Sequence, residues 1–241
     1  MDVIHNWNAW IGTDEAGKGD YFGPLVAAAV YVDAECRETF SDLGITDGKR
    51  LSNRRIQNLA ESMRCHYAQH IVVVEKMPAE YNSLYAMLRR RGQNLNHLLA
   101  SLHAEAIQTL ANSVGAKHAL VDKFAKDDLI TPQLARRADN RPHLQYDAVG
   151  SVRAAPATLE MEIRQVTKAE RDIAVAAASI IARDAFLTGM DTLSEKYEIC
   201  LPRGAYQVVE AGREFVKLHG NDALQNVAKL HFNLTDAVRA P

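Results

Sequence analysis

The sequence predicts an α/β fold, with a central mixed β-sheet flanked by helices and followed by a helical C-terminal portion. Near the N-terminus, segments 10–15 and 24–32 have the apolar composition of neighbouring buried strands. Apolar residues recur at helical spacing over 94–112, and segment 172–186 is rich in alanine. Both patterns predict long helices that cover the sheet.

Five short segments have the composition of strands. Segments 10–15 and 24–32 are separated by a short glycine-bearing connection, which favours an antiparallel pair. Segment 70–74 is rich in β-branched residues, and segment 119–122 is apolar and ends in an acid. Segment 159–167 alternates apolar and polar residues, as a half-buried strand does. These segments supply the predicted sheet.

Further helices are predicted between and after the strands. Ser52 can cap a helix over 53–66, in which apolar residues recur every three or four positions. Segment 126–157 is polar and contains prolines, so it is expected to form an irregular excursion on the surface. The chain is long enough to bury one core, and a single domain over 1–241 is expected, with short helices over about 190–241.

Composition and charge indicate an ordinary globular protein. Charged residues make up 24% and hydrophobic residues 47%, and the three cysteines match no zinc-binding pattern. No segment approaches the about 20 apolar residues of a membrane span, and the N-terminus lacks a secretory signal pattern. We therefore expect a monomer in the cytoplasm with no membrane partner. The net charge of −2 argues weakly against nucleic acid, and the arginine clusters at 89–91 and 136–141 are typical of solvated faces.

Acidic side chains fall at the ends of predicted elements. Asp14 and Glu15 end the first strand, Asp122 ends a later one, and Glu170 precedes the alanine-rich helix. A charge at a buried strand end costs several kcal/mol unless it is paired or metal-bound. Carboxylates also bind hard divalent cations, and two such ions about 3.5–4 Å apart can hydrolyse a phosphodiester. Because the chain has 30 acidic residues, chance placement explains the spacing slightly better than a metal site does.

Gly17, Lys18 and Gly19 form a glycine-rich turn after the first strand. Such a turn can expose backbone N–H groups to a phosphate. It lacks the pattern of a P-loop, and Gly23 follows one residue too late for a dinucleotide fingerprint. By itself the turn identifies no ligand.

Several blocks of sequence resemble those of type 2 ribonucleases H. The string GTDEAGKGDYFGPLV at 12–26 is similar to the opening signature of that family, and its GDYFGP portion resembles the ribonuclease HIII branch. Further similar blocks follow in order: DGKRLS at 47–52, VDKF at 121–124, TKAE at 167–170, AVAAASIIAR at 174–183, LPRGA at 201–205 and AKLHF at 228–232. The resemblance implies a ribonuclease H-like fold. It also implies hydrolysis of the RNA strand of RNA–DNA hybrids by a two-metal mechanism, with Mg²⁺ or Mn²⁺, leaving 5′-phosphate and 3′-hydroxyl ends.

The resemblance implies a catalytic, metal-binding set made of Asp14, Glu15, Asp122 and Glu170, the acids that the element ends had already indicated. A glutamate at the fourth position, Glu170, is similar to ribonuclease HIII, whereas ribonuclease HII has an aspartate there. Asp172 is interpreted as a helix-start acid, and Asp184 as part of a helix surface or, at most, as a group that supports the metal ligands without binding the metal.

The resemblance also implies substrate contacts. Gly17, Lys18 and Gly19 match a loop that would contact the minor-groove side of the hybrid, where RNA 2′-hydroxyls are displayed. Lys49 and Ser179 are candidate phosphate contacts, although a small residue in a tightly packed helix explains Ser179 equally well.

His97 and His103 lie in a segment that resembles a histidine-bearing helix of ribonuclease HIII. A structural role at a helix interface is favoured for both residues. When metal ions generate the nucleophile, no catalytic histidine is required.

The sequence also departs from the family pattern. Gly48 stands where the family often has a serine. Ribonuclease HIII proteins usually carry an N-terminal substrate-binding domain, and because the signature begins at Gly12 we expect either that this lineage lacks the domain or that the sequence is part of a longer chain. Ala205 stands where ribonuclease HII has a tyrosine that packs on the ribose of an RNA–DNA junction. Tyr206 is next to it, but one residue on a helix rotates a side chain by about 100°, so it is not expected to substitute. HII-like incision at single ribonucleotides and a non-catalytic hybrid-binding module therefore remain alternatives.

Overall fold

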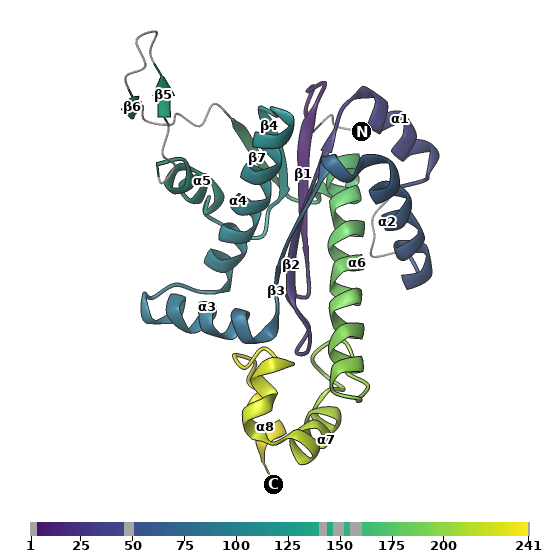
Figure 1. Cartoon of the computed structure of the whole chain (residues 1–241), viewed down its shortest axis with the longest axis vertical. Coiled ribbons are helices and arrows are strands. Elements are labelled where there is room, and N and C mark those ends of the chain that lie inside the picture. The colour runs from purple at the N-terminus through teal and green to yellow at the C-terminus, as the bar shows by residue number, and fades with distance from the viewer. Residues whose placement is uncertain (1–3, 46–50, 140–143, 147–151, 155–160, 241) are drawn as a thin grey trace.

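The computed structural model describes residues 4–45, 51–139, 144–146, 152–154 and 161–240 (Figure 1). Five strands form one sheet in the spatial order β3–β2–β1–β4–β7. Strands β1, β2 and β3 pair antiparallel, whereas β4 is parallel to both β1 and β7. These strands are β1 (Trp10–Ala16), β2 (Leu25–Val32), β3 (Ile71–Lys76), β4 (His118–Asp122) and β7 (Glu162–Val166). The predicted mixed sheet is confirmed.

Helices lie on both faces of this sheet, and the C-terminal helices lie below it in the view of Figure 1. The α-helices are α1 (Ala34–Asp42), α2 (Asn53–Tyr67), α3 (Pro78–Arg90), α4 (Leu95–Val114), α5 (Ile130–Asp139), α6 (Ile173–Lys196), α7 (Val209–His219) and α8 (Thr235–Arg239). The 3₁₀ turns are η2 (Ala68–His70), η3 (Ala169–Arg171) and η4 (Asn221–Asn226), and a separate two-stranded sheet pairs β5 (Leu144–Tyr146) with β6 (Val152–Ala154). The predicted helical C-terminal portion is therefore present.

Six elements differ from the sequence-based expectation. Helices α1 and α3 were not predicted, because each buries only two residues and so carries a weak apolar pattern. The segment 126–157, expected to be irregular, contains α5 and the β5–β6 pair. Helix α6 continues ten residues beyond the predicted end at Phe186, because Leu187, Met190 and Leu193 keep burying apolar surface at helical spacing.

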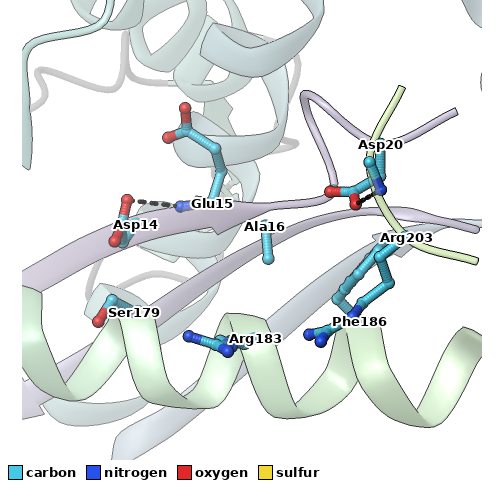
Figure 2. Close-up of a pocket in the computed structure, with 10 residues that line it drawn as sticks. Asp14, Glu15, Ala16, Asp20, Ser179, Arg183, Phe186 and Arg203 are labelled. Atoms are coloured by element: carbon cyan, nitrogen blue, oxygen red, sulfur yellow. Dashed lines mark hydrogen bonds between the residues drawn. The ribbon is translucent and has the colours of Figure 1, made fainter. Parts of the chain in front are cut away.

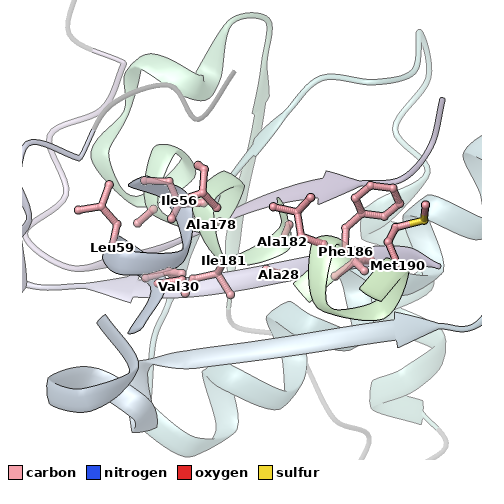
Figure 3. Packing of buried hydrophobic residues seen from close by; sticks show 14 of the residues in the cluster. Ala28, Val30, Ile56, Leu59, Ala178, Ile181, Ala182, Phe186 and Met190 are labelled. Atoms are coloured by element: carbon pink, nitrogen blue, oxygen red, sulfur yellow. The ribbon is translucent and has the colours of Figure 1, made fainter. Parts of the chain in front are cut away.

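The sheet is covered on both faces, which explains the nearly continuous apolar sequence of β2. Ala28 and Val30 of β2 belong to a buried cluster with α6 and α2, whereas Ala27 and Ala29 belong to a cluster built around α4. Figure 3 shows the first cluster, in which Ile181 of α6 packs beside β2. The sheet thus has no solvent-exposed face along β2.

Helix α6 crosses β1 at very close range. A Cβ atom on Gly12 would lie 2.2 Å from the backbone carbonyl carbon of Ala174 and 2.3 Å from the backbone nitrogen of Val175. Because no side chain fits into that space, the position requires glycine. The first turn of α6 therefore lies directly against β1, two residues before Asp14.

Among the described residues, α6 is the one helix long and apolar enough to cross a membrane. The prediction that no segment approaches this character was wrong for α6. However, 72% of its apolar window is buried inside the protein, where the helix packs against β1 and β2. Its composition is that of a core helix.

An amide side chain of α3 forms three hydrogen bonds with the C-terminal portion, in addition to the hydrogen bond between Tyr81 Oη and His231 Nδ1 at 3.1 Å. Asn82 Nδ2 donates to the carbonyl oxygens of Gln225 at 3.0 Å and Ala228 at 2.9 Å. The Oδ1 atom of the same side chain accepts from the N–H of Leu230 at 2.9 Å. These three hydrogen bonds hold the segment before α8 against the body of the molecule.

Candidate active site

Two of the predicted carboxylates lie at one edge of the sheet. Strands β1 and β4 are parallel neighbours, and the pairing of Thr13 with Val121 puts Asp14 and Asp122 at the next position of each strand. The carboxyl ends of parallel strands form the edge of an α/β sheet where ligands commonly bind. The topology therefore brings together two acids that are more than a hundred positions apart in the sequence.

The turn η3 carries Glu170 to the same edge. The N–H of Ala169 donates to Oδ1 of Asp122 at 3.0 Å, and the N–H of Lys123 donates to the carbonyl of Val166 at 2.9 Å. These two bonds fasten the chain after β7 to the end of β4. Glu170 is half-buried, and no hydrogen bond or ion pair joins it to another described residue.

Asp14 and Glu15 are adjacent on β1, so their side chains point to opposite faces of the sheet. The N–H of Glu15 donates to Oδ1 of Asp14 at 2.9 Å. Figure 2 shows Asp14 on the α6 side, near Ser179, and Glu15 directed away from α6. On that other face, Oε2 of Glu15 lies 3.1 Å from Nε2 of His103, a fully buried residue of α4.

The pKa of the Glu15 carboxyl group lies below its ordinary value. Burial by itself would raise this pKa, but the hydrogen bond from His103 and the positive charges of His103 and Lys18 outweigh burial. The other ring nitrogen of His103, Nδ1, forms a short hydrogen bond with Thr13 Oγ1, so the ring is held at both ends. Glu15 is therefore ionised at neutral pH, in the state that can bind a cation.

A cleft of about 410 Å³ opens beside Asp14 (Figure 2). Its walls come from β1, the loop after β1, α6 and the loop before α7. They are formed by Asp14, Glu15, Ala16, Gly17, Asp20, Ser179, Arg183, Phe186, Arg203 and Gly204. The cleft thus has acids at one end and two arginines nearby, an arrangement suited to a metal-bound phosphodiester.

Hydrogen bonds hold the loop after β1 in its shape. The N–H of Gly204 donates to Oδ1 of Asp20 at 2.7 Å. The Nζ atom of Lys229 donates to the carbonyls of Gly23 at 2.7 Å, Asp20 at 2.9 Å and Phe22 at 3.3 Å. Burial lowers the pKa of Lys229 to about 7, and the charge of Asp20 opposes that shift. The C-terminal portion therefore supports one wall of the cleft.

The acids suit a divalent cation in donor type, because carboxylate oxygens are the preferred ligands of hard cations. Asp14 and Asp122 also meet at one edge of the sheet. Within the described part of the chain, however, no three His, Cys, Asp or Glu side chains are close enough to form a ready metal site. Protein groups hold three of the acids instead: Asp14 accepts from the N–H of Glu15, Glu15 binds His103 and Lys18, and Asp122 accepts from the N–H of Ala169. Cation binding would require these side chains to exchange protein partners for the ion.

Comparison with known proteins assigns the chain to a family. The family model described as Ribonuclease HII matches residues 11–235, nearly the whole chain. The chain belongs to the ribonuclease HII family. It is therefore a ribonuclease H.

Curated relatives within this ribonuclease HII family are named Ribonuclease HIII. The chain is 37% identical over 229 residues to the protein of Protochlamydia amoebophila, which covers 95% of this chain and 67% of that protein. It is 35% identical over 231 residues to the protein of Chlamydia pneumoniae, covering 95% of this chain and 69% of the relative. The chain thus spans about two thirds of the length of these relatives.

Solved structures support the same ribonuclease H-like fold. The crystal structure of Bst-RNase HIII in complex with Mn²⁺ has a TM-score of 0.77 at 30% identity, over 95% of this chain and 68% of that one. Aquifex aeolicus RNase H3 has a TM-score of 0.67 at 27% identity, over 93% of this chain and 72% of that one. The predicted fold class is confirmed.

The predicted substrate residues of this ribonuclease H fall into four groups. Gly17 and Ser179 line the cleft, and Ser179 Oγ also donates to the carbonyl of Ala176 at 2.9 Å. Lys18 does not line the cleft but pairs with Glu15, with 3.5 Å between Nζ and Oε1. Lys49 lies outside the described residues. Gly19 faces open space, where an added Cβ would meet no atom within 4 Å.

The structure confirms one interpretation of a competing acid and corrects the other. Asp172 caps α6, accepting from the N–H of Ala174 at 2.9 Å and from Trp10 Nε1 at 3.0 Å. Asp184 does not lie on a helix surface as expected, because it is only 6% exposed and forms an ion pair with Arg64 of α2. The packing of α2 against α6 buries this face, which the sequence of α6 alone does not reveal.

The two histidines have different structural roles. His103 is buried between α4 and β1, as expected, and additionally contacts Glu15. His97 forms a capping box with Asn94 at the start of α4, which is a structural role.

Tyr206 lies in a loop rather than on a helix, so the rotation argument made from the sequence was wrong in its premise. The side chain is 98% exposed and is not part of the cleft wall. Arg203 and Gly204 line the cleft, and Ala205 does not. Tyr206 therefore makes no contact with the cleft in this conformation, which agrees with the expectation that it does not replace the missing tyrosine.

Sequence reasoning gave no role to several residues that shape the site. Arg183, Arg203 and Lys229 each fall within a block that resembles the family, which was the available signal. Their contacts with Asn53 and with the loop after β1 involve separations of more than a hundred residues. Asp20 likewise lies within a motif that resembles the family, and its carboxylate connects two walls of the cleft.

Proposed function

We propose that this ribonuclease H cuts the RNA strand of RNA–DNA hybrids in the cleft beside Asp14, using divalent cations held by Asp14, Glu15, Asp122 and Glu170. The observation that carries the proposal is the parallel pairing of β1 with β4, which brings Asp14 and Asp122 to one sheet edge beside a cleft that contains two arginines. Acids alone bind cations, but acids next to guanidinium groups suit a phosphodiester with bound metal.

A bound divalent cation supplies Lewis-acid activation of water and neutralises charge at the phosphate. The protein's own residues do the remaining work. His103, whose ring is held by Thr13, helps to keep Glu15 ionised and orients it at the edge of β1. Arg183 and Arg203 bring positive charge to the cleft, where it can attract the backbone phosphates of the substrate. Gly17 lines the cleft with a φ of +84°, and an added Cβ would lie 2.1 Å from the carbonyl oxygen of Pro24, so this cleft wall requires glycine.

Manganese is the first cation to test, because the similar Bst-RNase HIII was crystallised with Mn²⁺. Magnesium is the second, because both ions prefer oxygen ligands.

Cleavage of a labelled RNA–DNA hybrid should require Mn²⁺ or Mg²⁺ and should leave 5′-phosphate and 3′-hydroxyl ends. The physical reason is that activated water, rather than the 2′-hydroxyl, attacks phosphorus. Gel analysis of end-labelled products, with and without excess chelator, measures both features. Products with 2′,3′-cyclic phosphate, or full activity in chelator, would exclude this mechanism. Tight binding of hybrid without any cleavage would instead favour the non-catalytic binding module.

Activity on a single ribonucleotide within duplex DNA should be low compared with activity on a hybrid containing several ribonucleotides. Ala205 has no ring to pack on the junction ribose, and the neighbouring Tyr206 ring is fully exposed to solvent. The preference for the longer ribonucleotide stretch is measured by initial rates on the two duplexes at equal enzyme concentration. The measurement is made first with Mg²⁺ and then with Mn²⁺. Comparable rates with Mg²⁺ would favour the HII-like alternative. The variant Tyr206→Ala would then show whether that ring moves to the junction.

A further inference from the structure

Two arginines from distant parts of the chain meet at a single amide oxygen. Arg183 of α6 donates from Nη2 to Oδ1 of Asn53 at 3.1 Å, and Arg203 donates from Nη1 to the same oxygen at 3.2 Å. Asn53 is the first residue of α2 and lies in sequence 130 and 150 positions from these arginines. Because both nitrogens bind one oxygen, they lie within about 6 Å of each other.

Holding two guanidinium groups together is unfavourable unless an acceptor or an anion compensates their repulsion. The acceptor here is a neutral amide, so it orients the two groups without cancelling their charge. Within the described part of the chain, Arg203 has no ion-pair partner. Both arginines also line the cleft that contains Asp14 (Figure 2). The positive charge of Arg203 therefore remains available to an anion that enters this cleft, beside the guanidinium group of Arg183.

We propose that Asn53 is a positioning residue that holds Arg183 and Arg203 as a clamp for one backbone phosphate of the nucleic acid bound beside the carboxylates. A phosphate has two non-bridging oxygens and can accept from two guanidinium groups at once. A neutral acceptor at the base of the clamp is essential, because a carboxylate at this position would compete with the phosphate for both arginines. This inference rests on the proposed function, since it takes the hybrid as the ligand.

The proposal is tested with Asn53→Asp and Asn53→Ala, with Asn58→Asp as the matched control. Asn58 lies on the same helix, is exposed and makes no contact with either arginine, so its change adds the same charge without affecting the clamp. Asn53→Asp should raise KM for the hybrid about tenfold at moderate salt and leave kcat within about twofold. It should also reduce the slope of log(1/KM) against log[KCl] by about 1, because one phosphate contact is lost. Asn53→Ala should give a smaller rise in KM, because the guanidinium groups are freed but not neutralised.

A double-mutant cycle separates positioning from a general effect on folding. In an Arg203→Met background, Asn53→Ala should have little further effect, because the pair that it holds is already gone. Equal KM values for Asn53→Asp and Asn58→Asp, or a loss confined to kcat, would overturn the proposal. If the wild-type protein cuts no hybrid at all, the proposed function fails. In that case, the binding of labelled hybrid is measured by fluorescence anisotropy at several salt concentrations. The clamp predicts the same decrease of about 1 in the salt slope for Asn53→Asp.

Discussion

Replacing Asp14 or Asp122 by asparagine should lower kcat on the hybrid by about 10³-fold or more, because each change removes an anionic ligand from the proposed metal site. The fold should remain intact. An asparagine keeps a side-chain oxygen, which can still accept from the N–H of Glu15 at position 14 and from the N–H of Ala169 at position 122. Removing one charge from a group of acids also relieves repulsion when no cation is present. Melting temperature without metal should therefore stay level or rise.

The matched contrast is Asp184→Asn, which changes a buried acid outside the proposed metal set. Asp184 pairs with Arg64, and its side chain is only 8% exposed, so losing its charge should lower the melting temperature while most activity remains. Steady-state kinetics and thermal unfolding of the three variants distinguish the two roles. If Asp14→Asn loses activity only in proportion to lost stability, Asp14 is a structural residue and the proposed site is wrong.

Replacing Lys229 by methionine should lower both stability and activity. Methionine fills a similar volume but leaves the carbonyls of Asp20, Phe22 and Gly23 without their shared donor. Unsatisfied buried acceptors cost about 1–3 kcal/mol each, so the free energy of unfolding should fall by roughly 2–4 kcal/mol after the gain from removing a buried charge. Because these carbonyls belong to the loop that lines the cleft, kcat/KM on the hybrid should also fall by about 10- to 100-fold.

The pH dependence of stability provides a second readout for Lys229→Met. Burial lowers the pKa of Lys229 from 10.5 to about 7, so between these pH values the unfolded chain binds more protons than the folded one. The free energy of unfolding of the wild type should therefore rise with pH across this window, and the variant should lack that contribution. Lys217→Met, on the exposed face of α7, is the control and should change neither stability nor its pH dependence. Equal behaviour of the two variants would show that the Lys229 contacts contribute little.

Much of the fold follows from local patterns in the sequence. Ser52 caps α2 as predicted, and its hydroxyl accepts from the N–H of Arg55 at 3.3 Å. The apolar runs over 10–15 and 24–32 form the antiparallel pair β1 and β2. Local patterns failed where an element buries little surface, as in α1 and α3. They also failed for α5, whose sequence is polar enough to suggest an irregular loop.

Part of the candidate site could likewise be predicted from the sequence, and part could not. Sequence alone singled out Asp14, Glu15, Asp122 and Glu170. Charged residues at the ends of apolar segments are conspicuous in a linear chain, and the three motifs that contain these acids resemble one family. It also singled out Gly17 and Ser179, both of which line the cleft.

Only the tertiary structure decided how these residues are supported. Four features depend on segments that are far apart in the chain. They are the two contacts of His103 with β1, the burial of Asp184, the three carbonyls bound by Lys229 and the convergence of Arg183 and Arg203. Such contacts depend on the register of β1 with β4 and on the close crossing of α6 over Gly12, which place side chains within a few ångströms of one another. A periodic pattern reports which face of an element is buried, but hydrogen bonds and ion pairs form only at distances that packing sets.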